Sequence, residues 1–165
     1  MSRRIALVLV ITILLGGGLL LFRSRSNGRL PGQVEVHEMN LFDGLRNDWI
    51  ADLEAHRLQP SLDLYASDAV FINPDGTHSI GSAAIRSLYE SVFAAFDAQI
   101  RMVPMSHQLS GNLAFESGTY TEQTVERRTQ KVQNVHGDYL TVYRLEKPNR
   151  WLIVQQVWTE APQSK

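Results

Sequence analysis

Two residues in the second half of the chain have the side-chain types of an acid–base pair. His107 and Glu116 fall on stretches that alternate between apolar and polar residues, a pattern that predicts two successive strands. Side chains on neighbouring strands can face each other, so one residue could take a proton while the other orients it. This hypothesis describes an isomerase, lyase or cyclase acting on a hydrophobic substrate. The alternative is that both are ordinary polar side chains, exposed or satisfied by neighbours.

No motif for metal or cofactor chemistry occurs in the chain. The five histidines (37, 56, 78, 107 and 136) do not form the H-x-H, H-x-x-x-H or H-E-x-x-H spacings of metal ligands. There is no cysteine, no glycine-rich phosphate loop and no G-x-S-x-G motif around a nucleophilic serine. We therefore predict no metal site and no cofactor.

Aromatic and polar-tipped side chains predict a ligand pocket. They come from several separate segments, and a small molecule could contact their rings and a few polar groups. The candidate pocket residues are Trp49, Tyr65, Phe71, Asn73, Tyr120, His136, Tyr139 and Trp158. The alternative is that most of these side chains fill the core or a dimer interface.

The strand pattern divides several of these candidates between two sheet faces. Successive residues of a strand point to opposite faces, so Glu116 and Tyr120 share one face of their strand. On the next strand Tyr139 and Thr141 share a face, and His136 points the other way. Alternation alone leaves open which face is the concave one.

The stretch from Tyr65 to Phe96 sets the order of the elements that position these residues. Val70–Ile72 is a short β-prone run, and Asn73-Pro74-Asp75-Gly76 ends it in a tight turn. A second short strand over 77–80 follows, and Ser82 is the expected N-cap of a helix. That helix has one apolar face with helical spacing. The face consists of Ile85, Leu88, Tyr89, Val92, Phe93 and Phe96.

Helices are expected before this stretch and strands after it. Asn40 is the expected N-cap of the first helix, whose apolar stripe runs from Leu41 to His56, and Pro60–Tyr65 is expected to be a second, short helix. Later the period changes to two, with Pro104 marking an edge or bulge and Gly118 a bend. The expected strands are 100–109, 113–125, 132–146 and 151–159.

Several short motifs carry a family resemblance over about residues 40 to 160. They are Tyr65-Ala66-Ser67-Asp68-Ala69, Asn73-Pro74-Asp75-Gly76, Gly81-Ser82-Ala83-Ala84-Ile85-Arg86, Glu116-Ser117-Gly118-Thr119-Tyr120, Gly137-Asp138-Tyr139-Leu140 and Arg150-Trp151-Leu152-Ile153. Together they resemble the nuclear transport factor 2 superfamily, in its SnoaL-like, ketosteroid-isomerase-like and kinase-association-domain-like branch. The resemblance implies an α+β cone: three helices on a curved mixed, mostly antiparallel sheet (a cystatin-like roll) with a pocket between them. This fold hosts enzymes, binding proteins and oligomerisation modules, so it does not decide the function.

The catalytic residues of ketosteroid isomerases are not matched. The resemblance implies a carboxylate directly before the turn proline, a tyrosine on the first helix and a protonated aspartate on a late strand. The matching positions hold Asn73, Trp49 and Thr141, and Arg57 stands where many relatives carry an aspartate. We therefore predict that ketosteroid-isomerase chemistry is absent, and whether the chain is an enzyme stays open.

The N-terminus predicts a membrane anchor. Residues 5–22 are apolar apart from Thr12 and three glycines, and as a helix they would span about 27 Å of a hydrocarbon core of ~30 Å. The alternative is a cleaved signal peptide, although no small-x-small cleavage site follows. Residues 1–4 would form a tail and 23–37 a linker. The domain over 38–162 is expected outside the cytoplasm, periplasmic or extracellular, because a short N-terminal tail normally stays behind.

Charge and composition narrow the range of partners. The formal net charge is −1 at pH 7 and the sequence pI is near 6.5, which gives no basic face for nucleic acid. We predict a small apolar or amphipathic ligand, a homodimer and attachment to a membrane, with no nucleic-acid partner.

Overall fold

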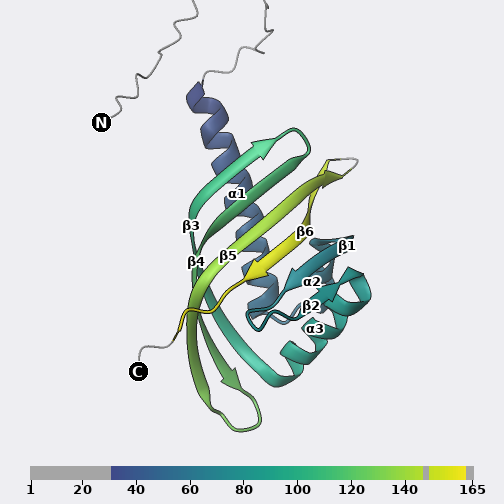
Figure 1. The fold of residues 1–165 in the computed structure, drawn as a ribbon, viewed down its shortest axis with the longest axis vertical. Coiled ribbons are helices and arrows are strands. Elements are labelled where there is room, and N and C mark those ends of the chain that lie inside the picture. Colours follow the sequence, from purple (N-terminus) through teal and green to yellow (C-terminus); the bar gives the residue numbers. More distant parts are fainter. Residues whose placement is uncertain (1–30, 147–148, 163–165) are drawn as a thin grey trace, which may run out of the picture.

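The computed structural model describes residues 31–146 and 149–162, with side chains from residue 39 onward. In this part of the chain three helices accompany one six-stranded sheet of order β2-β1-β6-β5-β4-β3 (Figure 1). Every neighbouring pair is antiparallel except β1 and β6, so the sheet is mixed as expected. The elements are α1 (Pro31–Glu54), α2 (Leu58–Asp63), β1 (Tyr65–Ile72), β2 (His78–Ile80), α3 (Gly81–Ala95), β3 (Phe96–Ser110), β4 (Leu113–Glu126), β5 (Val132–Glu146) and β6 (Arg150–Trp158).

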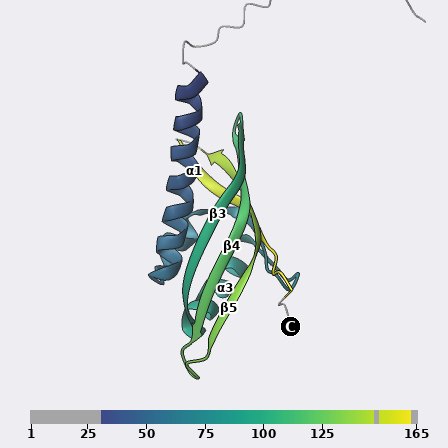
Figure 2. The ribbon, with the colours of Figure 1, turned by 90° about the vertical axis from the view of Figure 1, so that its left-hand side faces the viewer.

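The sheet is curved, and its buried face is the one that carries Glu116 and Tyr139. Figure 2 shows the long strands bending, with α1 on one side of them. Tyr120, Tyr139 and Tyr143 are all buried on this face, whereas His136 is exposed on the other. The structure therefore answers the question that alternation left open, and it confirms the α+β fold with a mostly antiparallel sheet.

The first helix begins earlier than the sequence analysis expects. It starts at Pro31, a residue that suits the first helical position because it lacks an N–H and its φ is already helical. Asn40 therefore lies inside the helix and is not its N-cap. The helix also runs across the boundary at residue 38, so residues 31–37, expected as linker, are helical here.

The buried face of α1 is also rotated slightly from the expected stripe. Its buried members are Phe42, Arg46, Trp49, Asp52 and Leu53, at helical spacing i, i+4, i+7, i+10 and i+11. Phe42 is only 1% exposed, while Leu41 is half-buried. Arg46 can be buried because it pairs with the buried carboxylate of Glu116. Hydropathy alone does not predict this pairing.

The short helix and the strand after it are both shifted toward the N-terminus. α2 ends at Asp63, and β1 begins at Tyr65 rather than at Val70. The early start follows from parallel pairing with β6, in which Tyr65 lies opposite Ile153 and a bulge precedes Val70. Local strand propensity does not predict pairing with a strand so distant in sequence.

The turn and third helix follow the expected order. The Asn73–Gly76 turn is closed by Gly76 N–H donating to the Asn73 carbonyl, and Gly76 has the positive φ of +80° that glycine tolerates. Along α3 the expected apolar face is confirmed, with Ile85, Tyr89 and Phe93 buried against the sheet. Ser82 is not the N-cap, however: the helix starts at Gly81 and no side chain caps it.

One close backbone approach shapes the long strands. Gly118 lies opposite Pro104 in the β3–β4 ladder, where the register of β3 shifts by a bulge. A Cβ on Gly118 would lie 2.1 Å from the Val103 carbonyl oxygen, far inside van der Waals contact. The expected bulge at Pro104 and bend at Gly118 are thus one feature, the place where the backbone of β3 lies close to Gly118 of β4.

The expected membrane segment, residues 5–22, lies outside the described residues. Within the ranges 31–146 and 149–162 no helix is both long and apolar enough to cross a bilayer.

Candidate functional site

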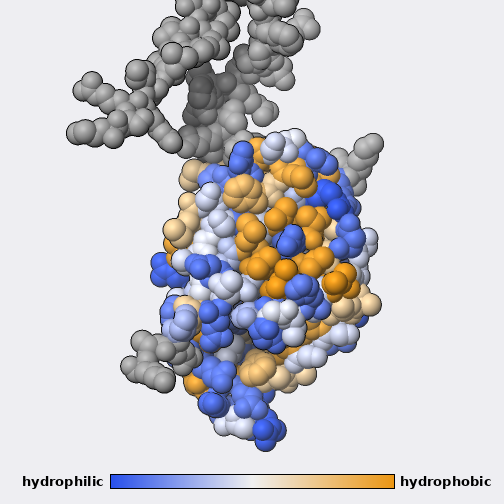
Figure 3. Space-filling model, viewed as in Figure 1, coloured by the Kyte–Doolittle hydropathy of each residue, from blue (hydrophilic) through white to orange (hydrophobic). Residues whose placement is uncertain are grey.

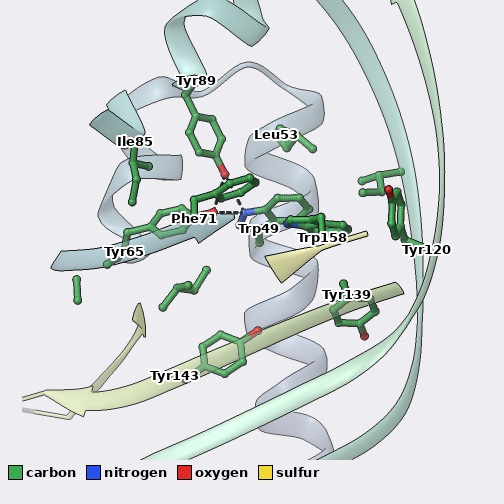
Figure 4. Close-up of a cluster of buried hydrophobic side chains, with 14 of the residues drawn as sticks. Trp49, Leu53, Tyr65, Phe71, Ile85, Tyr89, Tyr120, Tyr139, Tyr143 and Trp158 are labelled. Atoms are coloured by element: carbon green, nitrogen blue, oxygen red, sulfur yellow. Dashed lines mark hydrogen bonds between the residues drawn. The ribbon is translucent and has the colours of Figure 1, made fainter. Parts of the chain in front are cut away.

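A cavity of about 160 Å³ lies between the helices and the buried face of the sheet. α1, α3, the turn after β1 and the strands β3, β4 and β6 all contribute to its wall, and most of that wall is apolar or aromatic. Figure 4 shows several of these side chains converging from different elements. The lining residues are Trp49, Leu53, Phe71, Asn73, Pro74, Leu88, Tyr89, Val92, Ile100, Tyr120, Glu122 and Trp158.

Five of the eight predicted pocket residues line this cavity: Trp49, Phe71, Asn73, Tyr120 and Trp158. They come together because α1, β1 with the turn after it, β4 and β6 each place one of these residues against the space between the helices and the buried face of the sheet. Two more are close behind the wall, and one is not near it.

Tyr65 is the first of the two residues behind the wall, where it anchors a buried hydrogen-bond network. Its hydroxyl donates to the Gln156 side-chain carbonyl, so the hydroxyl of Tyr89 must donate to Tyr65, 2.9 Å away. The Trp49 indole N–H is shared between both tyrosine oxygens at 2.9 Å (Figure 4). Burial raises the pKa of Tyr65 well above its usual value and also that of Tyr89, so both stay protonated donors. The network uses these polar groups internally and holds the rings of Trp49 and Tyr89 in the cavity wall.

Trp158 is also in the wall, but its polar atom has no such partner. The side chain is buried, with its ring stacked 5.3 Å from that of Trp49 and edge-on to Tyr120 at 4.7 Å. Its indole Nε1–H is buried and meets no acceptor among the described residues. A buried donor without a partner is costly and in native proteins usually signals a missing water or ligand.

Glu122 is the one ionisable residue of the wall besides two tyrosines, and the sequence analysis missed it. Burial raises the pKa of this carboxyl, and no charged group of the described chain contributes to the shift. A usable signal was present in the sequence: Glu116, Tyr120 and Glu122 share one face of β4 by alternation.

The remaining polar groups of the wall are largely used within the fold. The Tyr120 hydroxyl donates to the Thr159 carbonyl at 3.1 Å, and burial raises the pKa of Tyr120 to about 12. The Asn73 side-chain amide donates to Thr77 within the turn, and its side-chain carbonyl has no donor among the described residues. The unpartnered N–H of Trp158 is buried out of reach of a water-sized group, so the unused polar groups of the wall are the acceptors of Glu122 and Asn73.

Glu116 belongs to a separate, fully buried ion pair. It is 1% exposed, accepts from Arg46 Nη1 at 2.5 Å and from the Tyr139 hydroxyl at 2.9 Å. Arg46 also pairs with Asp43 on the same helix. Burial raises the pKa of Glu116, opposed by the hydrogen bond from Tyr139 and by the charge of Arg46. Tyr139, the other predicted pocket residue behind the wall, is therefore committed to this cluster.

His107 lies directly opposite Glu116 in the β3–β4 ladder, but the two side chains do not form a pair. His107 is exposed, and its ring lies 5.0 Å from that of Phe42 on α1. Neither residue lines the cavity. The geometry therefore gives no support to an acid–base pair of His107 and Glu116 acting on a bound substrate.

His136 is the predicted pocket residue that lies away from the cavity. It is exposed on the other sheet face and borders a separate, open hollow with Gln99 and Asn134. No group of three or more histidine or acidic side chains able to hold a metal ion is found among the described residues.

The fold and this cavity define a class of protein: a nuclear transport factor 2-like domain, a cone with a pocket between helices and sheet. A family model described as a SnoaL-like domain matches residues 47–152, and the chain belongs to this family. No curated protein matches the chain significantly.

Solved structures with the same fold are distant in sequence. A ketosteroid isomerase-like protein from Erwinia carotovora atroseptica aligns with a TM-score of 0.67 at 15% identity, covering 73% of this chain and 94% of that one. A nuclear transport factor 2-like protein from Salmonella enterica gives 0.69 at 17%, covering 80% and 96%. A protein with a cystatin-like fold from Caulobacter vibrioides gives 0.62 at 13%, covering 75% and 89%. At these identities the likeness concerns the fold alone.

Proposed function

We propose that this SnoaL-like domain binds a small apolar or amphipathic molecule in the cavity between α1, α3 and the sheet. The observation that carries the proposal is the cavity itself, about 160 Å³ of space whose wall is mostly apolar and aromatic. Side chains around such a space lack packing partners on one side, and an apolar ligand would restore these contacts.

The size of the cavity limits the ligand to about one ring. A cavity of roughly 150 Å³ lined by apolar side chains is known to accept benzene, and this cavity measures about 160 Å³. Rings from Trp49, Phe71, Tyr89, Tyr120 and Trp158 surround it, and such side chains favour flat aromatic guests by edge and face contacts.

Filling the cavity tests the proposal. In Val92→Phe, a half-buried wall residue of α3 becomes larger and occupies part of the space. The matched control is Ala94→Phe, which adds a ring on the exposed side of the same helix. We expect 2-phenylethanol to bind the parent chain and the control in ligand-observed NMR, and to bind Val92→Phe at least about tenfold more weakly. Equal binding to all three proteins, or binding to none, would exclude the cavity as the site.

We also propose that the chain forms a homodimer through the outer face of the sheet. An apolar hollow on this face is bordered by Leu113, Phe115, Leu140 and Val142. Figure 3 shows apolar side chains gathered across the middle of the face seen in Figure 1. Contiguous exposed apolar surface of this kind is typical of protein interfaces.

The dimer is tested by charge on that face. Tyr139 and Tyr143 point into the core, so the informative substitution is Leu140→Glu. The control is Thr119→Glu, at an exposed position of β4 outside the hollow. Light scattering after size exclusion should give a dimer for the parent and the control and a monomer for Leu140→Glu. A monomeric parent chain removes this part of the proposal.

Attachment to a membrane through residues 5–22 completes the proposal. It rests on the sequence of that segment, which is long and apolar enough to span a bilayer. Full-length protein that stays with the membrane fraction after an alkaline wash would support it, and release into the supernatant would contradict it.

A further inference from the structure

We propose that the cavity also supports a reaction, in which Glu122 acts as a general base. It removes a C–H proton from a small aromatic substrate, and the substrate then expels its own leaving group. The inference rests on the proposed function, because the substrate is a ligand of the same cavity. It adds a reaction class to binding, a base-promoted elimination, and assigns the base to a residue other than His107 or Glu116.

Glu122 lies where the cavity meets the open hollow beside His136. Both spaces are bordered by Glu122 and by Ile100, its partner in the β3–β4 ladder, so the carboxyl is at the open side of the cavity. The side chain is half-buried, and its oxygens are not among the buried atoms that lack a hydrogen-bond partner. A ring bound in the cavity can therefore approach the carboxylate, and water can reach it from the hollow.

The charged and titratable side chains around Glu122 do not pair with it. They are Glu54, Arg101, Tyr120 and His136. Among the described residues none forms an ion pair with Glu122. Arg101 and His136 both lie opposite Thr121 in the ladders, so they belong to the other sheet face. Glu54 accepts the Ile100 N–H at 2.9 Å.

An unpaired, half-buried carboxylate is a stronger base than one in water. Burial disfavours the ionised form and raises the pKa of Glu122, with no charged neighbour opposing the shift. Proton transfer to a base becomes more favourable as the pKa of that base rises, and a bound substrate is held beside it. The position of Glu122 and its surroundings thus both suit a general base.

The wall supplies this base without a free side-chain donor to stabilise a new anion. In the described chain, the N–H or O–H groups of Trp49, Tyr89, Tyr120 and Asn73 all donate within the fold. The N–H of Trp158 is buried with almost no accessible surface. An enolate oxygen would therefore lack the donors on which such reactions depend. The favoured substrate takes up the electron pair itself, as an elimination does.

The elimination needs only the substrate and one carboxylate. The Glu122 carboxylate takes the proton, and the electron pair of the broken C–H bond forms a new π-bond. The bond to the leaving group breaks, and its electron pair stays on the leaving group. The carboxyl then releases the proton to water in the open hollow, which restores the base.

The test uses 5-nitro-1,2-benzisoxazole, a flat fused bicycle that carboxylates open in a single step. Loss of the C3 proton forms a nitrile, breaks the N–O bond and gives a coloured nitrophenolate. One ring fits the cavity while the other lies at its open side. With the full-length chain in lipid nanodiscs we expect saturable turnover, with kcat/KM about 100-fold or more above the second-order rate constant of acetate. Deuterium at C3 should slow the reaction, because the C–H bond breaks in the rate-limiting step.

Variants and pH assign the activity to Glu122. Glu122→Gln should lower kcat by about 100-fold or more and leave binding of the bicycle nearly unchanged, because the amide keeps the shape and lacks the base. Glu90→Gln, on the exposed side of α3, is the matched control and should keep the parent rate. The rate should rise with pH as the carboxyl ionises, with a midpoint above the usual glutamate pKa of about 4.3.

The outcomes separate this inference from the proposed function. Binding of the bicycle without turnover, or turnover that survives Glu122→Gln, shows that the base assignment is wrong while the ligand cavity stands. If 2-phenylethanol binds and the bicycle does not, a cavity ligand cannot reach the carboxyl and the assignment also fails. Exchange of the acetophenone methyl protons in D₂O that depends on Glu122 would overturn the elimination class. If neither compound binds, the proposed function itself fails.

Discussion

Trp49 and Trp158 both line the cavity, but they differ in whether the indole N–H has a hydrogen-bond acceptor. The Trp49 N–H is held by Tyr65 and Tyr89, so this side chain is fixed from behind and presents only its ring to the cavity. Trp158 has no acceptor for its N–H among the described residues. Residue type alone therefore does not tell how each indole is held, which depends on the hydrogen bonds of its N–H.

Glu122 should lower the stability of the empty protein above its usual pKa. Because burial raises the pKa of the folded-state carboxyl, the folded state holds the proton more tightly than the unfolded state. The penalty is absent below the unfolded pKa of about 4.3 and grows as the pH rises through the raised folded value.

Glu122→Gln should therefore stabilise the empty protein at pH 7.5, by less than about 1 kcal/mol because solvent screens a half-buried carboxyl, and should change little at pH 4. Thermal unfolding at the two pH values measures this. A variant that is less stable than the parent at pH 7.5 would contradict the account of Glu122 as an unpaired, desolvated group.

Unlike the unpaired Glu122, Glu116 is paired with Arg46 in the core. Removing either partner of this ion pair alone should therefore lower the stability of the protein. Arg46→Met leaves Glu116 buried without its cation, and we expect the free energy of unfolding to fall by about 3 kcal/mol or more. Adding Glu116→Gln removes the stranded charge and should recover part of the loss. Urea unfolding of both variants measures these changes. A loss of unfolding free energy below about 1 kcal/mol in Arg46→Met would contradict a buried ion pair between Arg46 and Glu116.

At the scale of elements, β3 and β4 approach closely at Gly118, and the same two strands form one side of the cavity. Ile100, Tyr120 and Glu122 come from these two strands and form one side of the wall. Gly118 allows the close approach because there is no room for a side chain above the Val103 carbonyl. The shape of the cavity thus depends on a backbone contact outside it.

Gly118→Ala should force the strands apart and cost about 2 kcal/mol or more of unfolding free energy, as a clash with backbone cannot be relieved by a rotamer change. Gly44→Ala is the matched comparison: this helical glycine has open space around its Cβ position and should gain about 0.5–1 kcal/mol. Chemical unfolding of the two variants measures both changes in unfolding free energy. An unchanged stability in Gly118→Ala would contradict the close approach of the Val103 carbonyl to Gly118.

The elements themselves could largely be read from the sequence, for physical reasons that differ. The stripe from Ile85 to Phe93 has a helical period over about two and a half turns, and the alternation of β4 and β5 has a period of two, so both patterns report burial directly. The early starts of α1 and β1 were missed, because a proline start and a parallel partner strand leave no periodic signal.

At the scale of the whole molecule, part of the candidate site could be predicted from the sequence. The motifs around Asn73 and Tyr120 predict which segments surround the cavity, and five of the eight expected residues do line it. The assignment of His107 and Glu116 to chemistry rested on their residue types. Burial and the Arg46 contact commit Glu116 elsewhere, and such contacts between residues 70 positions apart cannot be read from one sequence. Glu122 was overlooked because a lone carboxylate resembles any exposed strand residue until its surroundings are known.

The most direct test of the whole account is the indole N–H spectrum of the full-length chain, labelled with ¹⁵N and titrated with 2-phenylethanol. The chain has three tryptophans, and two of them line the cavity while Trp151 does not. We predict that the Trp49 and Trp158 resonances move, because the rings of both residues line the cavity, and that the Trp151 resonance stays in place. A spectrum in which Trp158 does not respond, or in which Trp151 alone does, would contradict the cavity as the binding site.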